Sequence, residues 1–290
     1  MTKNIWATAP VRIDISAGWS DANPFQSGFG GAVLNAAINL RVKGSLKNGC
    51  LSTCLDNVPA NSGLGTSGAL RTVYLVVANP CLCDEKIELI KRVHIFENAI
   101  VGQRAGYQDQ AAAVFGGVNY WEFKKDGKII RKNISRAKTQ HLYNRLVLVY
   151  TGDRHQSSNV HEQVFGDKTY IKKVFPMQKM KIIAKQMYEN ISNEKKMTAL
   201  MNETWLLQKS LHNEMETKAM QRIQRFAEGN YLACRATGAG GGGCMLFYTK
   251  DKCKLIRILK KMNGRIPKMR VLPFEFDYKG LETNGSCVVK

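Results

Sequence analysis

Hydrophobic positions in the first half of the chain follow two different periods. Apolar and β-branched runs separated by turn residues predict strands, whereas longer apolar runs behind a capping residue predict helices. Strands are expected at residues 5–15, 32–42, 118–123 and 146–151. Helices are expected at residues 69–78, from Asp84, as N-cap, to Val101, and from Tyr107 onward. Residues 43–49 and 124–127 are expected to be turns.

The second half of the chain has a different pattern. Residues 161–225 have helical spacing, with interruptions at Pro176 and at residues 193–196. A strand at 244–248, a helix at 252–262 and a strand at 269–276 follow. A helix-rich segment that closes on strand, helix and strand predicts a second α+β domain. We therefore expect domains at residues 1–152 and 153–290, divided near Gly152.

Residues 58–70 form a glycine-punctuated loop that runs directly into the first predicted helix. Such a loop lets backbone N–H groups converge where the helix dipole is positive, which is typical of a phosphate site. Residues 63–68 also fit G-x-G-x-x-G, and Asp84 follows at a distance that suits a dinucleotide site. The approach to Gly63 is rich in turn residues and not an apolar strand, which argues against that interpretation. A glycine-rich turn before an ordinary helix remains the alternative.

Composition is that of a folded protein with an unusual charge. The 290 residues are 44% hydrophobic and carry a formal net charge of +20. No run of about 18 apolar residues and no signal-peptide core occur, so we expect a cytoplasmic protein without membrane association. The eight cysteines lack zinc-site spacing and are expected to be reduced. Neither an aromatic ladder nor a nucleic-acid module accompanies the lysines, so anionic small substrates are favoured over nucleic acid.

Motifs in four places resemble those of the GHMP kinases, the superfamily of galactokinase, homoserine kinase and mevalonate kinase. They are Ala9-Pro10-Val11-Arg12 with Gly18-Trp19-Ser20-Asp21, Pro59 with Gly63-Leu64-Gly65-Thr66-Ser67, Gly106-Tyr107-Gln108-Asp109, and the glycine loop at residues 238–243. Within the superfamily the chain resembles D-glycero-D-manno-heptose 7-phosphate kinases and the L-fucose kinase domain. The resemblance implies a two-domain α+β GHMP kinase fold, with an N-terminal domain like domain 2 of ribosomal protein S5 and a ferredoxin-like C-terminal domain.

The resemblance also implies roles for individual residues. Asp109 corresponds to the catalytic aspartate and Arg12 to the basic residue beside it, while Ser67 and Glu97 correspond to the ligands of Mg²⁺. Residues implied in ATP binding are Pro59, Asn61, Ser62, Gly63, Leu64, Gly65, Thr66, Ser67, Gly240 and Gly241. Residues implied in sugar binding are Asp21, Trp19, Gly106 and Gln108. Each also has an ordinary structural interpretation, such as a helix N-cap for Asp109 or a turn former for Asp21.

The chain departs from the family between Leu40 and Asp56, where a short turn is expected in place of further strands or a helix around the adenine site. Gly68 also stands where serine or alanine is usual. We expect an ATP- and Mg²⁺-dependent kinase, with a possible homodimer, that phosphorylates the anomeric hydroxyl of a sugar, most plausibly a heptose 7-phosphate. The alternatives are an L-fucose-type kinase, a non-catalytic relative that binds sugar and nucleotide, a nicotinamide oxidoreductase and a nucleic-acid-binding protein.

Overall fold

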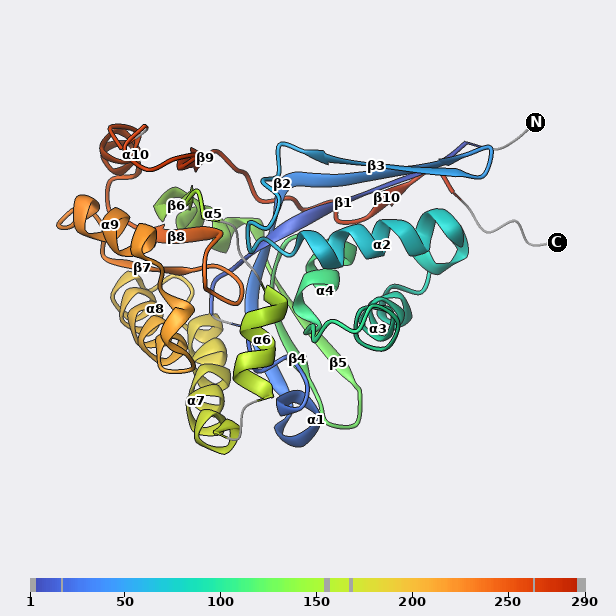
Figure 1. Ribbon diagram of the computed structural model, residues 1–290, viewed down its shortest axis with the longest axis horizontal. Coiled ribbons are helices and arrows are strands. Elements are labelled where there is room, and N and C mark those ends of the chain that lie inside the picture. The colour runs from blue at the N-terminus through green and yellow to red at the C-terminus, as the bar shows by residue number, and fades with distance from the viewer. Residues whose placement is uncertain (1–3, 17, 154–156, 167–168, 263, 286–290) are drawn as a thin grey trace.

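The computed structural model describes residues 4–16, 18–153, 157–166, 169–262 and 264–285. In these ranges helices pack against two antiparallel sheets (Figure 1). Every strand pairing in the described ranges is antiparallel, which excludes the parallel sheet that a nicotinamide-binding domain requires. The expected α+β class is confirmed, and the oxidoreductase interpretation of residues 63–68 is wrong.

The larger sheet has six strands in the described part of the chain, in the order β10-β1-β2-β4-β5 with β3 paired to β2. Its strands are β1 (Ile5–Asp14), β2 (Gly31–Lys47), β3 (Cys50–Asp56), β4 (Val118–Phe123), β5 (Ile129–Ile134) and β10 (Glu282–Thr283). Strand β1 alternates inward and outward residues at first and is buried on both faces from Ala9 onward. Helices α2 (Thr66–Ala78) and α4 (Gln108–Phe115) both pack against β1.

Three helices cover one face of this sheet (Figure 1). They are α2 (Thr66–Ala78), α3 (Lys86–Ile95) and α4 (Gln108–Phe115), and α3 continues as the π-helical turn η2 (Phe96–Ile100). Helix α2 buries Ala69, Val73, Val76 and Val77, a stripe of helical spacing, against β1 and β2. The smaller elements of this half are α1 (Phe25–Phe29), η1 (Pro80–Cys83) and α5 (Arg136–Arg145). The packing of these α2 residues on the sheet fixes the position of the first turn of α2, which directly follows the glycine loop.

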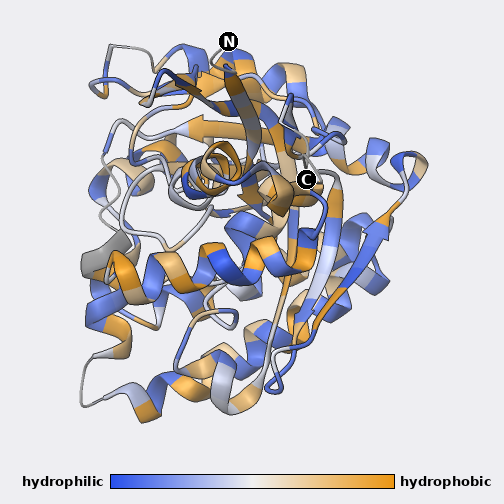
Figure 2. Cartoon of the chain, turned by 90° about the vertical axis from the view of Figure 1, so that its right-hand side faces the viewer, coloured by the Kyte–Doolittle hydropathy of each residue, from blue (hydrophilic) through white to orange (hydrophobic). Residues whose placement is uncertain are grey.

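The smaller sheet contains β6 (Leu146–Tyr150), β7 (Ala233–Ala236), β8 (Cys244–Tyr248) and β9 (Arg270–Leu272). Their order, β7-β8-β6-β9, places the strands as second, third, first and fourth in the chain, which is the ferredoxin-like order. The helices of this half are α6 (Ser157–Phe165), α7 (Tyr170–Glu189), α8 (Glu194–Lys209), η3 (Asn213–Met215), α9 (Lys218–Ala227) and α10 (Lys252–Lys260). In Figure 2 hydrophilic and hydrophobic residues alternate along the outer helices, as expected for helices with one buried face.

The smaller sheet is buried on both faces. Leu146, Leu148 and Tyr150 of β6 belong to the core shared with the larger sheet, whereas Val147 and Val149 pack with residues of α9 and α10. This explains the uninterrupted apolar run of β6. Strand β10 returns to pair with β1, so the end of the chain joins the larger sheet. The division of the chain near Gly152 stays a prediction.

Several local predictions are wrong. Residues 40–56 are not a short turn, because β2 runs on to Lys47 and pairs with β3 in a hairpin. All seven residues of β3 are exposed, so no hydrophobic alternation marks this strand in the sequence. Pro176 does not interrupt a helix but lies buried inside α7. Asp84 does not cap the next helix, whose N-cap is Glu85. Cys81 is disulfide-bonded, so not all cysteines are reduced.

In the described part of the chain, no helix is both long and apolar enough to span a membrane.

Candidate active site

The glycine loop before α2 has the backbone conformation of an anion cradle. Asn61, Gly63 and Gly65 all have positive φ, at 53°, 71° and 72°. Gly65 is the N-cap of α2 and provides no side-chain hydrogen bond to the first turn. The N–H groups of that turn therefore remain available to a ligand, where the helix dipole favours negative charge.

A second glycine loop packs directly on the first. A Cβ atom on Gly63 would lie 2.7 Å from the carbonyl oxygen of Thr237, and one on Gly238 would lie 2.5 Å from the carbonyl oxygen of Gly63. The Cys244 amide also donates to the Ser62 carbonyl at 2.8 Å. Close backbone contact thus explains why Gly63 and Gly238 carry no side chains. These two residues lie 175 positions apart in the sequence.

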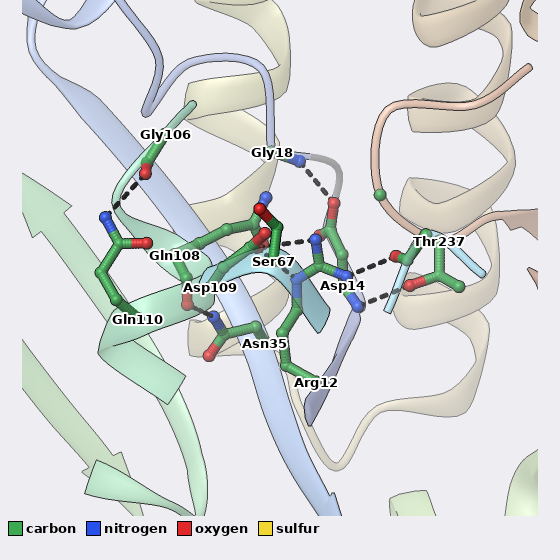
Figure 3. Close-up of polar contacts among 12 residues, drawn as sticks. Arg12, Asp14, Gly18, Asn35, Ser67, Gly106, Gln108, Asp109, Gln110 and Thr237 are labelled. Carbon is green, nitrogen blue, oxygen red and sulfur yellow. Dashed lines mark hydrogen bonds and ion pairs between the residues drawn. The ribbon is translucent and has the colours of Figure 1, made fainter. Parts of the chain in front are cut away.

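Arg12 and Asp109 form an ion pair at the floor of this cradle (Figure 3). Arg12 Nε and Nη2 lie 2.8 and 2.7 Å from Asp109 Oδ1, and Arg12 Nη1 donates to the Gly63 carbonyl at 2.6 Å. Arg12 comes from β1, and Asp109 from the first turn of α4. A Cβ atom on Gly68 would lie 2.6 Å from Asp109 Cβ. Glycine at position 68, unusual for the resembled family, therefore makes room for the aspartate.

Ser67 and Glu97 meet beside the same cradle. Ser67 Oγ donates to Glu97 Oε1 at 2.9 Å. Glu97 is 2% exposed, and its Oε2 has no hydrogen-bond partner among the described residues. Burial, together with the nearby Asp109 carboxylate, raises the pKa of Glu97 to about 7. One hydroxyl and one carboxylate with a free oxygen suit a hard cation that keeps several waters, so these two residues fit Mg²⁺.

No cluster of three or more His, Cys, Asp or Glu side chains in the described ranges could hold a metal by itself. A cation at Ser67 and Glu97 would therefore depend on water and on a bound ligand for its other contacts.

Asp21 is a further buried carboxylate that lines the cleft. It is 1% exposed, and its Oδ2 accepts from the Gln108 amide at 2.9 Å. Burial, the largest cause, and the carboxylates of Asp109 and Asp14 raise the pKa of Asp21 to about 7. A Cβ atom on Gly106 would lie 2.2 Å from Asp21 Oδ2, so glycine there admits the carboxylate. Trp19 lies in the left-handed region, at φ 60°, and packs edge-on against His161.

A cleft of about 460 Å³ joins these groups. Of the residues expected at the site, it is lined by Arg12, Trp19, Asp21, Asn61, Ser62, Gly63, Gly65, Thr66, Ser67, Glu97, Gly106, Gln108 and Asp109. The other four do not line it. Pro59 and Leu64 are buried, and Gly240 and Gly241 pack close to Met215 and Val160.

Two groups of residues at the site were not anticipated from sequence. Asp14 and Arg235, both 0% exposed, form an ion pair at 3.4 Å, and Thr237 Oγ1 accepts from the Asp14 amide at 2.9 Å. Arg71 and Gln103 line the cleft beside Ser67. The first group joins β1 to β7 and the second glycine loop, so only the long-range pairing could reveal it. Arg71 has a sequence signal in hindsight, because it stands one helical turn after Ser67.

The comparisons with known proteins agree with this arrangement. Residues 32–117 match the model for the GHMP kinases N terminal domain. The D-glycero-alpha-D-manno-heptose 7-phosphate kinase of Campylobacter jejuni is 27% identical over 238 residues, which are 78% of this chain and 68% of that protein. The L-fucokinase/L-fucose-1-P guanylyltransferase of Bacteroides fragilis is 23% identical over 97% of this chain, which spans only 38% of that protein.

A solved structure has the same fold. It is a D-glycero-D-manno-heptose 1-phosphate kinase from Bacteroides thetaiotaomicron, with a TM-score of 0.73 and 20% identity over 98% of this chain and 99% of that one. The chain thus contains a GHMP kinase N-terminal domain and has sugar kinases among its homologues, which, with the cleft built from two glycine loops, support a phosphotransferase that acts on an alcohol group.

Proposed function

We propose that this phosphotransferase transfers the γ-phosphoryl group of ATP to the anomeric hydroxyl of a sugar, and that this sugar is a heptose 7-phosphate. The observation that carries the proposal is the position of the Arg12–Asp109 pair in the cleft that also holds Ser67 and Glu97. An acceptor hydroxyl bound near Asp109 would lie close to a triphosphate held by the first turn of α2. Phosphoryl transfer depends mainly on such positioning and on neutralised charge.

In this proposal Asp109 orients the acceptor hydroxyl and accepts its proton as the bond to phosphorus forms. Arg12 holds the carboxylate through Oδ1 and leaves Oδ2 for the hydroxyl. Ser67 and Glu97 would hold Mg²⁺, which when bound supplies positive charge against the phosphate oxygens. Asp21 and Gln108 would position the sugar.

The nucleotide would enter over the β2–β3 hairpin. Thr53, Cys54 and Leu55 of β3 line the cleft together with Arg71. The triphosphate would then run along residues 62–67, of which all but Leu64 line the cleft. The Ser62 and Thr66 hydroxyls, buried without a hydrogen-bond partner among the described residues, could complete its contacts. A cytoplasmic location and a homodimer stay predictions.

The test is ATP consumption measured with a panel of sugars and sugar phosphates, on the wild type, Asp109→Asn and the matched control Asp126→Asn. Asp126 lies in the exposed β4–β5 turn and accepts only from the Lys128 amide. We expect turnover with at least one sugar phosphate, a loss of about 10²–10⁴-fold in Asp109→Asn and no change in Asp126→Asn. Turnover that survives Asp109→Asn would remove Asp109 from the proposed role.

An L-fucose-type kinase is the second candidate, because the Bacteroides fragilis relative aligns with almost the whole chain. Dependence on a phosphate group of the acceptor separates the two. Activity with an unphosphorylated deoxyhexose and not with heptose phosphates would favour the second candidate. Nucleotide and sugar binding without turnover across the whole panel would favour a non-catalytic relative.

A further inference from the structure

The Arg71 guanidinium donates to Ser67 and lies close to Glu97, the two residues that we propose as metal ligands. Arg71 stands on α2, one turn after Ser67. Its Nη1 donates to Ser67 Oγ, donates to the Ser67 carbonyl at 3.2 Å and lies 3.6 Å from Glu97 Oε1. Ser67 Oγ in turn donates to Glu97 Oε1. The hydroxyl and the carboxylate are therefore both engaged by one cation of the chain.

The charge of Glu97 explains why a cation is found there. Its carboxylate is 2% exposed, and a buried carboxylate requires a counter-charge. Arg71 is the basic residue that pairs with Glu97 in the described part of the chain. Arg12, the nearest other cation of the site, is committed to Asp109 and the Gly63 carbonyl. Glu97 thus depends on Arg71 when no metal is bound.

We propose that Arg71 competes with the divalent metal for Ser67 and Glu97. The Arg71 guanidinium must move away from both residues before the metal can bind them. The inference rests on the proposed function, because it takes Ser67 and Glu97 as the ligands. A divalent ion bound to both residues would lie close to the Arg71 guanidinium, which donates to Ser67 Oγ and lies 3.6 Å from Glu97 Oε1, and the two positive charges repel. Metal affinity would then be set partly by the free energy of moving Arg71.

The structure also offers Arg71 a second position. Its Nη2 donates to Gln103 Oε1 at 3.1 Å, and Gln103 lies on the exposed loop that leads to Gly106. Arg71 Nε is buried without a hydrogen-bond partner among the described residues, so one donor is free for a new acceptor. A guanidinium that keeps Gln103 and releases Ser67 would stay in the cleft, where bidentate contact with phosphate oxygens suits its geometry. Binding of a nucleotide with its metal would thereby favour the movement of Arg71 away from Ser67.

The test measures Mn²⁺ binding, by the electron paramagnetic resonance signal of free Mn²⁺, with and without a non-hydrolysable ATP analogue. The variants are Arg71→Met, Arg71→Lys and the control Arg92→Met, whose arginine forms an exposed pair with Glu88 one turn away on α3. Without nucleotide we expect Arg71→Met to bind Mn²⁺ about tenfold more tightly than the wild type, the equivalent of one broken charged hydrogen bond. Arg71→Lys should fall between them, and Arg92→Met should match the wild type.

Thermal unfolding without metal gives an independent readout. Arg71→Met should melt at a lower temperature than the wild type without metal, and the gap should shrink when Mn²⁺ is added, because the metal replaces the lost charge. Equal Mn²⁺ affinity in Arg71→Met and wild type, or weaker affinity in Arg71→Met, would overturn the inference while leaving the metal site intact. If Glu97→Gln binds Mn²⁺ and the analogue as the wild type does, the proposed metal site itself fails, and the inference fails with it.

Discussion

Arg12 contacts a single carboxylate oxygen of Asp109 with two of its nitrogens. Both Nε and Nη2 of the arginine approach Oδ1, and Nη1 reaches across to the Gly63 carbonyl of the glycine loop. The carboxylate is thus held through one oxygen by a side chain that also joins β1 to the phosphate loop. Arg12 is 4% exposed, so solvent screens these contacts little.

This geometry predicts that Arg12→Lys keeps the fold but loses catalytic rate. Lysine preserves the charge but cannot contact Asp109 and Gly63 with separate, fixed donors. We expect kcat to fall about 10–100-fold, in line with a lost positioning contact, and the KM for ATP to change less. Steady-state kinetics measure both, circular dichroism checks folding, and Arg92→Lys, at an exposed position of α3, serves as control. A higher KM for ATP with an unchanged kcat would contradict this role.

Local sequence determined much of the site. The glycine loop, the helix that follows it and the helix start that bears Asp109 were all predictable, because turn chemistry and hydrophobic period act over a few residues. The nearness of Arg12 and Asp109, 97 residues apart, was inferred only through family resemblance. Propensity alone gives no such long-range pairing.

Other features were beyond sequence reasoning for identifiable reasons. Strand β3 carries no inward face, so its pairing with β2 left no alternation to detect. Pro176 lies inside α7 because flanking Val174, Met177 and Met180 are buried and offset the lost backbone hydrogen bond. The Asp14–Arg235 pair joins residues 221 positions apart, so no local pattern in the sequence predicts the contact.

Contact between the glycine loops predicts a strong effect of Gly238→Ala. The new Cβ would lie 2.5 Å from the Gly63 carbonyl oxygen, and the φ of Gly238 is +81°. Gly127→Ala is a matched control, because Gly127 has a φ of +78° but open space around its Cβ position. We expect the control to lose about 1–2 kcal/mol of unfolding free energy from backbone strain alone. Gly238→Ala should lose clearly more and also bind ATP more weakly, as measured by urea unfolding and calorimetric titration. Equal losses in both variants would show that the loops separate easily.

The buried pair between β1 and β7 predicts a large stability loss in Arg235→Met. Arg235 Nη1 donates to the Asp14 carbonyl at 2.8 Å, and Nη2 donates to Gln208 Oε1 at 2.9 Å. Removal of the arginine leaves the Asp14 carboxylate buried without its counter-charge, which costs about 3–5 kcal/mol. The double variant Asp14→Asn/Arg235→Met should recover part of this loss, because the uncompensated charge is gone. Urea unfolding of the three proteins measures the coupling, and strictly additive losses would contradict it.

The burial of Asp21 predicts an unusual dependence of stability on pH. Its pKa in the folded protein is raised to about 7 from an ordinary value near 3.8, so between these two values the folded state holds a proton that the unfolded chain releases. Stability from Asp21 is therefore present at acid pH and is lost as pH rises toward 7, by up to about 1.4 kcal/mol per pH unit. Above pH 7 both states are ionised, and the contribution no longer changes.

Asp21→Asn isolates this contribution. Asparagine cannot ionise, yet its oxygen can still accept from the Gln108 amide. The difference in unfolding free energy between Asp21→Asn and the wild type should therefore grow in favour of the variant from pH 4 to pH 7 and then level off. Glu97, whose pKa is also raised to about 7, is present in both proteins, so its effect cancels in the difference. Urea unfolding at pH 5, 6, 7 and 8 gives the curve. Parallel pH profiles for the two proteins would mean that Asp21 is ionised throughout this range, because a carboxylate that holds no proton when folded cannot link stability to pH.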